Sequence, residues 1–199
     1  AQPAPLAQPA QPTEPAQPVE PAQPGATTRI TSPPMRFESV HSYKAPADAV
    51  GSALVDPAFY AELDLPDVGR PRLDAHTRDG AVHRLVTTWV YSGELDPLAR
   101  RVVGSHKISW SQTLVFDEAT MTGSLDITSA IQPGRISCRA SVNVIAAGKR
   151  SSRRTIRGEL KIGIPLIGGK AESALVPGIL ARLDREGDEL GRWLRRPGS

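Results

Sequence analysis

The sequence predicts an α+β fold, in which a curved antiparallel sheet of about seven strands is wrapped around one long C-terminal helix. Three patterns predict it. Apolar and polar residues alternate over 36–44 and over most of 68–164, which is typical of half-buried strands. Two short apolar stripes bounded by prolines follow the first strand and indicate two short helices. Apolar residues then recur every three or four positions over 170–195, as on a helix with one buried face.

The first strand is expected over residues 36–44. Because side chains alternate across a strand, one face carries Phe37, Ser39, His41 and Tyr43. Pro46 and Asp48 are typical of a helix start, and Asp56-Pro57 ends that helix. Phe59 and Tyr60 then belong to the second short helix, which closes at Leu65-Pro66.

Six further strands are expected as a meander. Their ranges are 68–78, 81–92, 107–116, 120–131, 135–146 and 151–164. Asp79-Gly80 is a strong hairpin signal between the first two. Residues 93–103 are ambiguous, because Asp96-Pro97 also suits the start of a helical turn.

The long helix is expected over Lys170–Arg195. Charged residues, Arg182 among them, are expected on its other faces, and Pro177-Gly178 is expected to kink it or to delay its regular start. Its apolar stripe contains Leu175, Val176, Ile179, Leu183, Leu190, Trp193 and Leu194.

Composition divides the chain. Residues 1–34 hold 10 of the 19 prolines and no aromatic residue, which predicts a disordered Pro/Ala/Gln-rich tail. Residues 35–196 are expected to form one domain, followed by a short C-terminal tail over 197–199. With no apolar stretch of about 20 residues, no membrane span is expected, and a cytoplasmic location is the default.

Charge and cysteine content narrow the function classes. The formal net charge of +3 is mild, so nucleic acid is not an expected partner. The basic run Lys149–Arg157 is expected at a solvated hairpin tip, with peripheral contact to an anionic membrane surface or nucleic acid as the alternative. Cys138 is the single cysteine, which excludes a disulfide framework, and is expected to be a buried, inert thiol. The oligomeric state is not predicted.

No catalytic motif stands out in the sequence. A nucleophile elbow, a phosphate loop, a dinucleotide fingerprint and a helical metal-binding His pair are all missing, so no cofactor, metal site or catalytic residue is expected. His76 and His83 flank the Asp79-Gly80 turn and are expected as a surface pair. His41 is expected to be a hydrogen-bonded lining or edge residue, the alternative being a proton donor or acceptor in a cavity.

Several segments resemble a known superfamily. Residues 43–50 (Tyr43 to Val50) and 56–60 (Asp56 to Tyr60) resemble the opening of the START-like, polyketide-cyclase-like (SRPBCC) superfamily, which has the helix-grip fold. Residues 110–114 and the helix start at 168–172 also resemble it. Within that superfamily the chain is most similar to a bacterial family of unknown function, over residues 35–196. The resemblance implies ligands such as lipids, sterols, polyketides and hydrophobic hormones.

The leading hypothesis is therefore binding, with or without transport, of a small hydrophobic ligand such as a lipid or polyketide between the sheet and the long helix. A buried amide needs a partner, so Gln112 is expected to be hydrogen-bonded. One alternative is a cyclase, dehydratase or hydrolase that uses His41, Tyr43 or Gln112. Another is a non-catalytic interaction domain with a filled core. The expected cavity lining is Phe37, His41, Tyr43, Trp89, Trp110, Gln112, Phe116, Ile179 and Leu183.

Overall fold

The computed structural model describes residues 33–94, 97, 100, 108–130, 134–163 and 168–196 of the 199. All of these belong to the second of the two units into which the chain divides, residues 31–199. The predicted tail up to residue 32 and the tail over 197–199 lie outside the described residues, and the domain boundaries stay predictions. Most of the ambiguous stretch 93–103 also lies outside them, although Pro97 and Arg100 are helical. The elements are β1 (Met35–Tyr43), α1 (Ala47–Leu54), α2 (Pro57–Glu62), β2 (Arg72–Asp79), β3 (Val82–Val90), β4 (Ser109–Asp117), β5 (Thr122–Ser129), β6 (Ile136–Gly148), β7 (Ser151–Ile162) and α4 (Gly168–Trp193).

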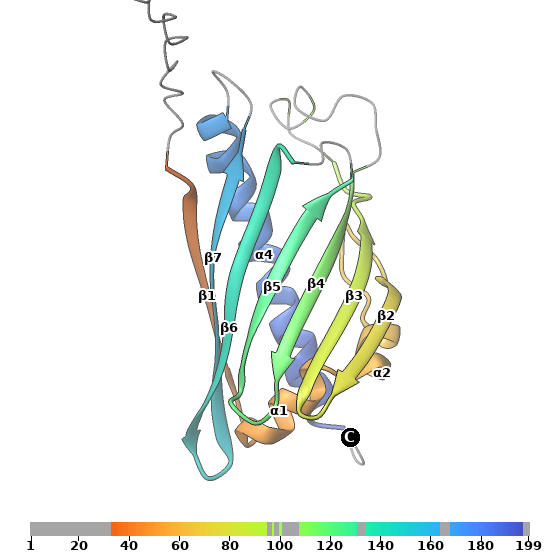
Figure 1. Cartoon of the computed structure of the whole chain (residues 1–199), viewed down its shortest axis with the longest axis vertical. Helices are drawn as coiled ribbons and strands as arrows, with labels where there is room; N and C mark the ends of the chain where they lie inside the picture. Colours follow the sequence, from red (N-terminus) through yellow and green to blue (C-terminus); the bar gives the residue numbers. More distant parts are fainter. Residues whose placement is uncertain are drawn as a thin grey trace, which may run out of the picture. The chain divides into compact units, whose positions relative to one another are not determined.

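The seven described strands form one curved sheet in the order β1-β7-β6-β5-β4-β3-β2. Every neighbouring pair is antiparallel, as expected of a meander whose first strand closes against its last. Helix α4 runs along one face of the sheet and contacts β1 and β7, while α1 and α2 lie near its C-terminal half (Figure 1). The predicted α+β architecture is confirmed.

Local chemistry accounts for the short elements. Asp56 caps α2, because its Oδ1 accepts a hydrogen bond from Ala58 N at 2.8 Å. Gly80 has φ +59° in the β2–β3 hairpin, a conformation that glycine adopts without steric cost. The strand predicted from residue 68 begins only at Arg72, because Leu65 and Gly69 first form an isolated bridge around a tight turn.

Helix α4 runs from Gly168 through Pro177 to Trp193, so the alternative of a delayed regular start is wrong, while the kink at Pro177 stays a prediction. Pro177 cannot donate to the helix ladder, but buried Val176 and Leu183 on either side hold the helix against the sheet. The start of α4 is also fixed, because Glu172 Oε1 accepts from Ile162 N at 2.7 Å.

The sheet and α4 enclose a core that differs at its two ends. We call the end that carries α1 and α2 the α1–α2 end, and the opposite end, where α4 begins, the α4-start end (Figure 1). At the α1–α2 end Phe59, Tyr60 and Phe116 are fully buried. At the α4-start end Leu160, Ile162 and Ala171 are buried, but a further set of apolar side chains is only partly buried: Met35, Trp110, Ile127, Ile136, Leu175 and Ile179.

Candidate functional site between the sheet and helix α4

Two tryptophans face each other across β3 and β4. Trp89 and Trp110 are directly opposite in the strand register, with ring centroids 6.3 Å apart and planes within 4°. Trp89 is fully buried, and its Nε1 donates to Thr87 Oγ1 at 3.0 Å. Trp110 is partly buried, and its inaccessible Nε1 has no partner. The N–H of the Trp110 indole is therefore buried without a hydrogen-bond acceptor.

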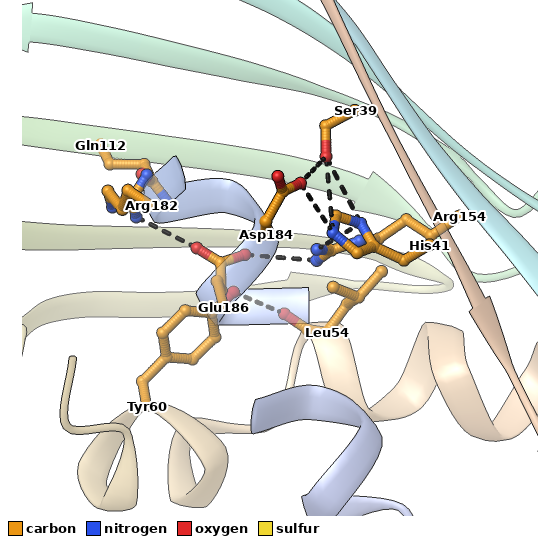
Figure 2. A network of polar contacts seen from close by, with 9 residues as sticks. All are labelled: Ser39, His41, Leu54, Tyr60, Gln112, Arg154, Arg182, Asp184 and Glu186. Carbon is orange, nitrogen blue, oxygen red and sulfur yellow. Dashed lines mark hydrogen bonds and ion pairs between the residues drawn. The ribbon is translucent and has the colours of Figure 1, made fainter. Parts of the chain in front are cut away.

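Arg182 of α4 lies against this pair. Its Cζ is 4.2 Å from the Trp89 ring centroid and 5.9 Å from that of Trp110. Its Nη2 donates to Gln112 Oε1 at 2.8 Å and to Glu186 Oε2 at 3.1 Å, while its Nε has no partner (Figure 2). The contact confirms the expectation that Gln112 is hydrogen-bonded.

The prediction that Arg182 lies on an outer face of the helix is wrong. Its residue is 9% exposed, and burial lowers the pKa of its guanidinium, against the raising effect of the Glu186 carboxylate. A cation held over an aromatic ring and hydrogen-bonded to an amide and a carboxylate recovers much of the lost hydration. Helical spacing places Arg182 on the same face as Leu175 and Ile179, so its burial could have been predicted from the sequence. Its charge instead favoured the prediction of a solvent-exposed position.

Arg154 of β7 is the second buried guanidinium. It is fully buried, its Nη1 donates to Glu186 Oε1 at 3.2 Å, and its Nη2 lies 3.4 Å from His41 Nδ1 (Figure 2). The prediction that Lys149–Arg157 as a whole forms a solvated tip is therefore wrong for this residue. Strand alternation gives the signal, because residue 154 shares its face with the buried Ile156. Membrane contact through the rest of the run stays a prediction.

His41, Ser39 and Asp184 meet where β1 contacts α4. Ser39 Oγ donates to Asp184 Oδ1 at 3.0 Å, and His41 Nε2 lies 3.2 Å from the same oxygen (Figure 2). His41 Nδ1 lies 3.4 Å from the donor Arg154 Nη2, and both ring nitrogens lie 3.5 Å from Ser39 Oγ. Burial, followed by Arg154, lowers the pKa of His41, against the raising effect of Asp184. The cluster pins α4 to β1.

The other predicted lining residues divide between two places. Phe37, Phe116 and Leu183 are buried in the core, while Ile179 is partly buried one turn before Arg182 on α4. His41 and Tyr43 line a groove of about 470 Å³ between β1 and α4, with Gly187, Asp188 and Arg195. Burial raises the pKa of Tyr43 to about 12. A ligand role for all nine residues stays a prediction.

Two further predictions concern histidine and cysteine. His76 Nε2 lies 3.1 Å from His83 Nδ1, so these residues do meet across the hairpin. His83 is buried and lies 3.0 Å from Glu118 Oε2, so the prediction of a surface pair is wrong for this member. It shares the inner face of β3 with Leu85, Thr87 and Trp89. The prediction that Cys138 is buried is confirmed, and burial raises the pKa of its thiol to about 11.

Comparison with known proteins places the chain in a family. The model of the family described as "Protein of unknown function (DUF2505)" matches residues 38–194. The chain belongs to this family. No curated protein sequence matches the DUF2505 chain. The predicted resemblance to a family of unknown function is thereby confirmed.

Solved structures similar to the DUF2505 chain share its fold. TTHA0849 from Thermus thermophilus is 16% identical, with a TM-score of 0.60 over 83% of this chain and 100% of that one. The Zhui aromatase/cyclase from Streptomyces sp. R1128 is 13% identical, with a TM-score of 0.56 over 83% and 98%. Norcoclaurine synthase from Thalictrum flavum is 13% identical, with a TM-score of 0.57 over 93% and 100%. The START-like helix-grip fold predicted from the sequence is confirmed, and at these identities the likeness shows the fold alone.

Two kinds of feature are absent from the described part of the DUF2505 chain. Over these residues no helix combines the length and apolar composition needed to cross a bilayer. Within the same ranges no three His, Cys, Asp or Glu side chains gather as a metal site requires.

Proposed function

We propose that this protein binds a small, largely apolar molecule between the sheet and α4, and that the molecule reaches its site at the α4-start end. The observation that carries the proposal is the unsatisfied indole N–H of Trp110. Its ring is partly buried beside other partly buried apolar side chains, yet its Nε1 is inaccessible and has no partner. A buried N–H without an acceptor is unfavourable, and a bound molecule would supply the missing acceptor together with apolar contact.

The fold supports the same proposal. The similar structures include an aromatase/cyclase and norcoclaurine synthase, whose names describe work on small organic molecules. Transport of the ligand and a cytoplasmic location stay predictions from the sequence. An enzymatic role that uses His41, Tyr43 or Gln112 stays the alternative predicted from the sequence.

The test is a titration of the full chain with an apolar fluorescent probe, 1-aminoanthracene, followed through tryptophan quenching and probe emission. We expect saturable binding at one site. Trp110→Ala should weaken it about tenfold or more, because aromatic contact area and a hydrogen-bond donor are lost together. Arg153→Ala, on the exposed face of β7, is the matched control and should leave binding unchanged.

One observation favours a different function. The Arg182 guanidinium occupies the space above the Trp89 ring, as it would in an interaction domain with a filled core. On that reading no apolar probe binds saturably, and Trp110→Ala changes only stability. That result would contradict the ligand-binding proposal.

A further inference from the structure

The buried polar atoms without partners share one property. Among the described residues they are Tyr43 Oη, Trp110 Nε1, Ser152 Oγ, Arg154 Nε and Arg182 Nε. The three nitrogens are hydrogen-bond donors only, and the two hydroxyls can donate as well. Among the described residues, no buried side-chain carboxylate or amide oxygen lacks a hydrogen-bond partner. The described interior therefore has an excess of donors and lacks acceptors.

Charge shows the same imbalance. Arg154 and Arg182 are both buried, and both direct a guanidinium nitrogen at the one carboxylate of Glu186 (Figure 2). Asp184, the other acid of this cluster, has a side chain that is 62% exposed and bonds Ser39 and His41. One guanidinium charge is thus left without a buried counter-charge, and burying such a charge is strongly unfavourable.

Geometry places this excess beside the proposed ligand site. The Arg182 guanidinium carbon lies 5.9 Å from the Trp110 ring centroid, and each residue carries an unpartnered N–H. A carboxylate can accept hydrogen bonds of about 2.9 Å on each of its two oxygens, so it is the kind of acceptor that two neighbouring donors require. Partly buried Leu175 and Ile179 precede Arg182 on α4 and offer apolar contact to the rest of such a molecule.

We infer that the ligand is an amphipathic carboxylic acid, whose carboxylate accepts hydrogen bonds from Arg182 and Trp110 while its apolar body extends toward the α4-start end. The inference rests on the proposed function and names its ligand class. The carboxylate would supply both the missing acceptor and the missing negative charge. A neutral ester of the same shape keeps a carbonyl acceptor but supplies no negative charge.

The test compares acids with their methyl esters on the full chain. The probes are cis-parinaric acid, naphthoic acid and the methyl ester of each, at pH 7.5 and low salt. We expect at least one acid to bind about tenfold or more tightly than its own ester, since a charge-assisted hydrogen bond is at stake. Equal binding of acid and ester would overturn the inference and leave the proposed function standing. Binding by none of the four would overturn both.

Two variants locate the carboxylate. Trp110→Phe keeps an aromatic ring but removes Nε1, so it should lower the affinity of the acid several-fold and that of the ester by less, because only the bond to the carboxylate is charge-assisted. Arg182→Gln should abolish the preference for the acid, and Arg185→Gln, on an exposed part of the same helix, is its matched control. If Arg182→Gln does not fold, the Trp110→Phe comparison still decides. Equal losses for acid and ester in Trp110→Phe would contradict the inference.

Discussion

The two ends of the core between the sheet and α4 differ in how completely their aromatic side chains are buried. At the α1–α2 end, Phe59 packs edge-on against Tyr60 and Trp193, and the Tyr60 hydroxyl donates to Leu54 O at 2.9 Å. At the α4-start end, Trp110 is partly buried and its indole donor is unsatisfied. The first end packs fully buried rings and supplies stability, although Tyr43 Oη and Ser152 Oγ, opposite each other where β1 leads to α1, have no partner. The second leaves partly buried apolar side chains and one indole donor without a partner, and it is there that we propose the ligand site.

The largest expected effect tests the closed end. Phe59→Ala should lower the free energy of unfolding by about 3–5 kcal/mol, because it removes a fully buried ring and leaves a cavity. Ile179→Ala, a partly buried residue near the other end, should cost only about 1 kcal/mol. Chemical denaturation of both variants measures the difference. Equal losses would show that the two ends are equally important for stability.

The buried charges between the two ends give the next prediction. Glu186→Gln should destabilise the protein by about 3 kcal/mol, because two buried guanidiniums lose their shared carboxylate. Glu189→Gln breaks a pair with the exposed Arg192 and should cost less than about 1 kcal/mol. Urea unfolding at pH 7 gives both values, and similar losses would contradict the central role of Glu186.

Two glycines of α4 test how closely the helix approaches β1. A Cβ at Gly187 would lie 2.3 Å from His41 Cδ2, whereas a Cβ at Gly178 would meet nothing within 4 Å. Gly187→Ala should therefore destabilise by about 1–3 kcal/mol through overpacking. Gly178→Ala should stabilise by roughly 0.5–1 kcal/mol, because alanine loses less conformational freedom in a helix. The melting temperatures of both variants measure these effects. A Gly187→Ala variant as stable as the unchanged protein would show that His41 can move away from α4 at little cost.

The smallest effect is a dependence on pH. The folded protein holds the pKa of His41 below the ordinary value of 6.5, so protonation favours the unfolded chain. The stability linked to His41 is complete above pH 6.5 and declines as the pH falls through the folded pKa. Unfolding free energies at pH 7.5 and pH 5.5 should differ less in His41→Asn than in the unchanged protein. The other histidines and the acids titrate in both proteins, so the variant isolates His41, and an identical pH dependence would contradict its role.

Strand and helix periods were enough to predict most of the fold. Alternation in β4 placed Gln112 and Phe116 on the inner face, and alternation in β6 placed Cys138 there, because one buried face fixes the period of two. The prediction of a delayed start to α4 was wrong, because local proline chemistry was outweighed by packing on both sides of Pro177. The strand and helix periods depend only on residues that are close in the sequence, so the sequence was enough to predict these elements.

The burial of Arg154, Arg182, Glu186 and His83 was decided by the tertiary structure alone. Their positions share faces with apolar residues, yet a charged or polar side chain is buried only where a partner satisfies it. Those partners come from afar: Glu186 for Arg154 at a separation of 32 residues, and Gln112 for Arg182 at 70. Local helical spacing predicts only the pair of Arg182 with Glu186, four residues apart, and not these distant partners. The sequence by itself determined the elements and their order, whereas only the folded chain brought together the charges at the candidate site.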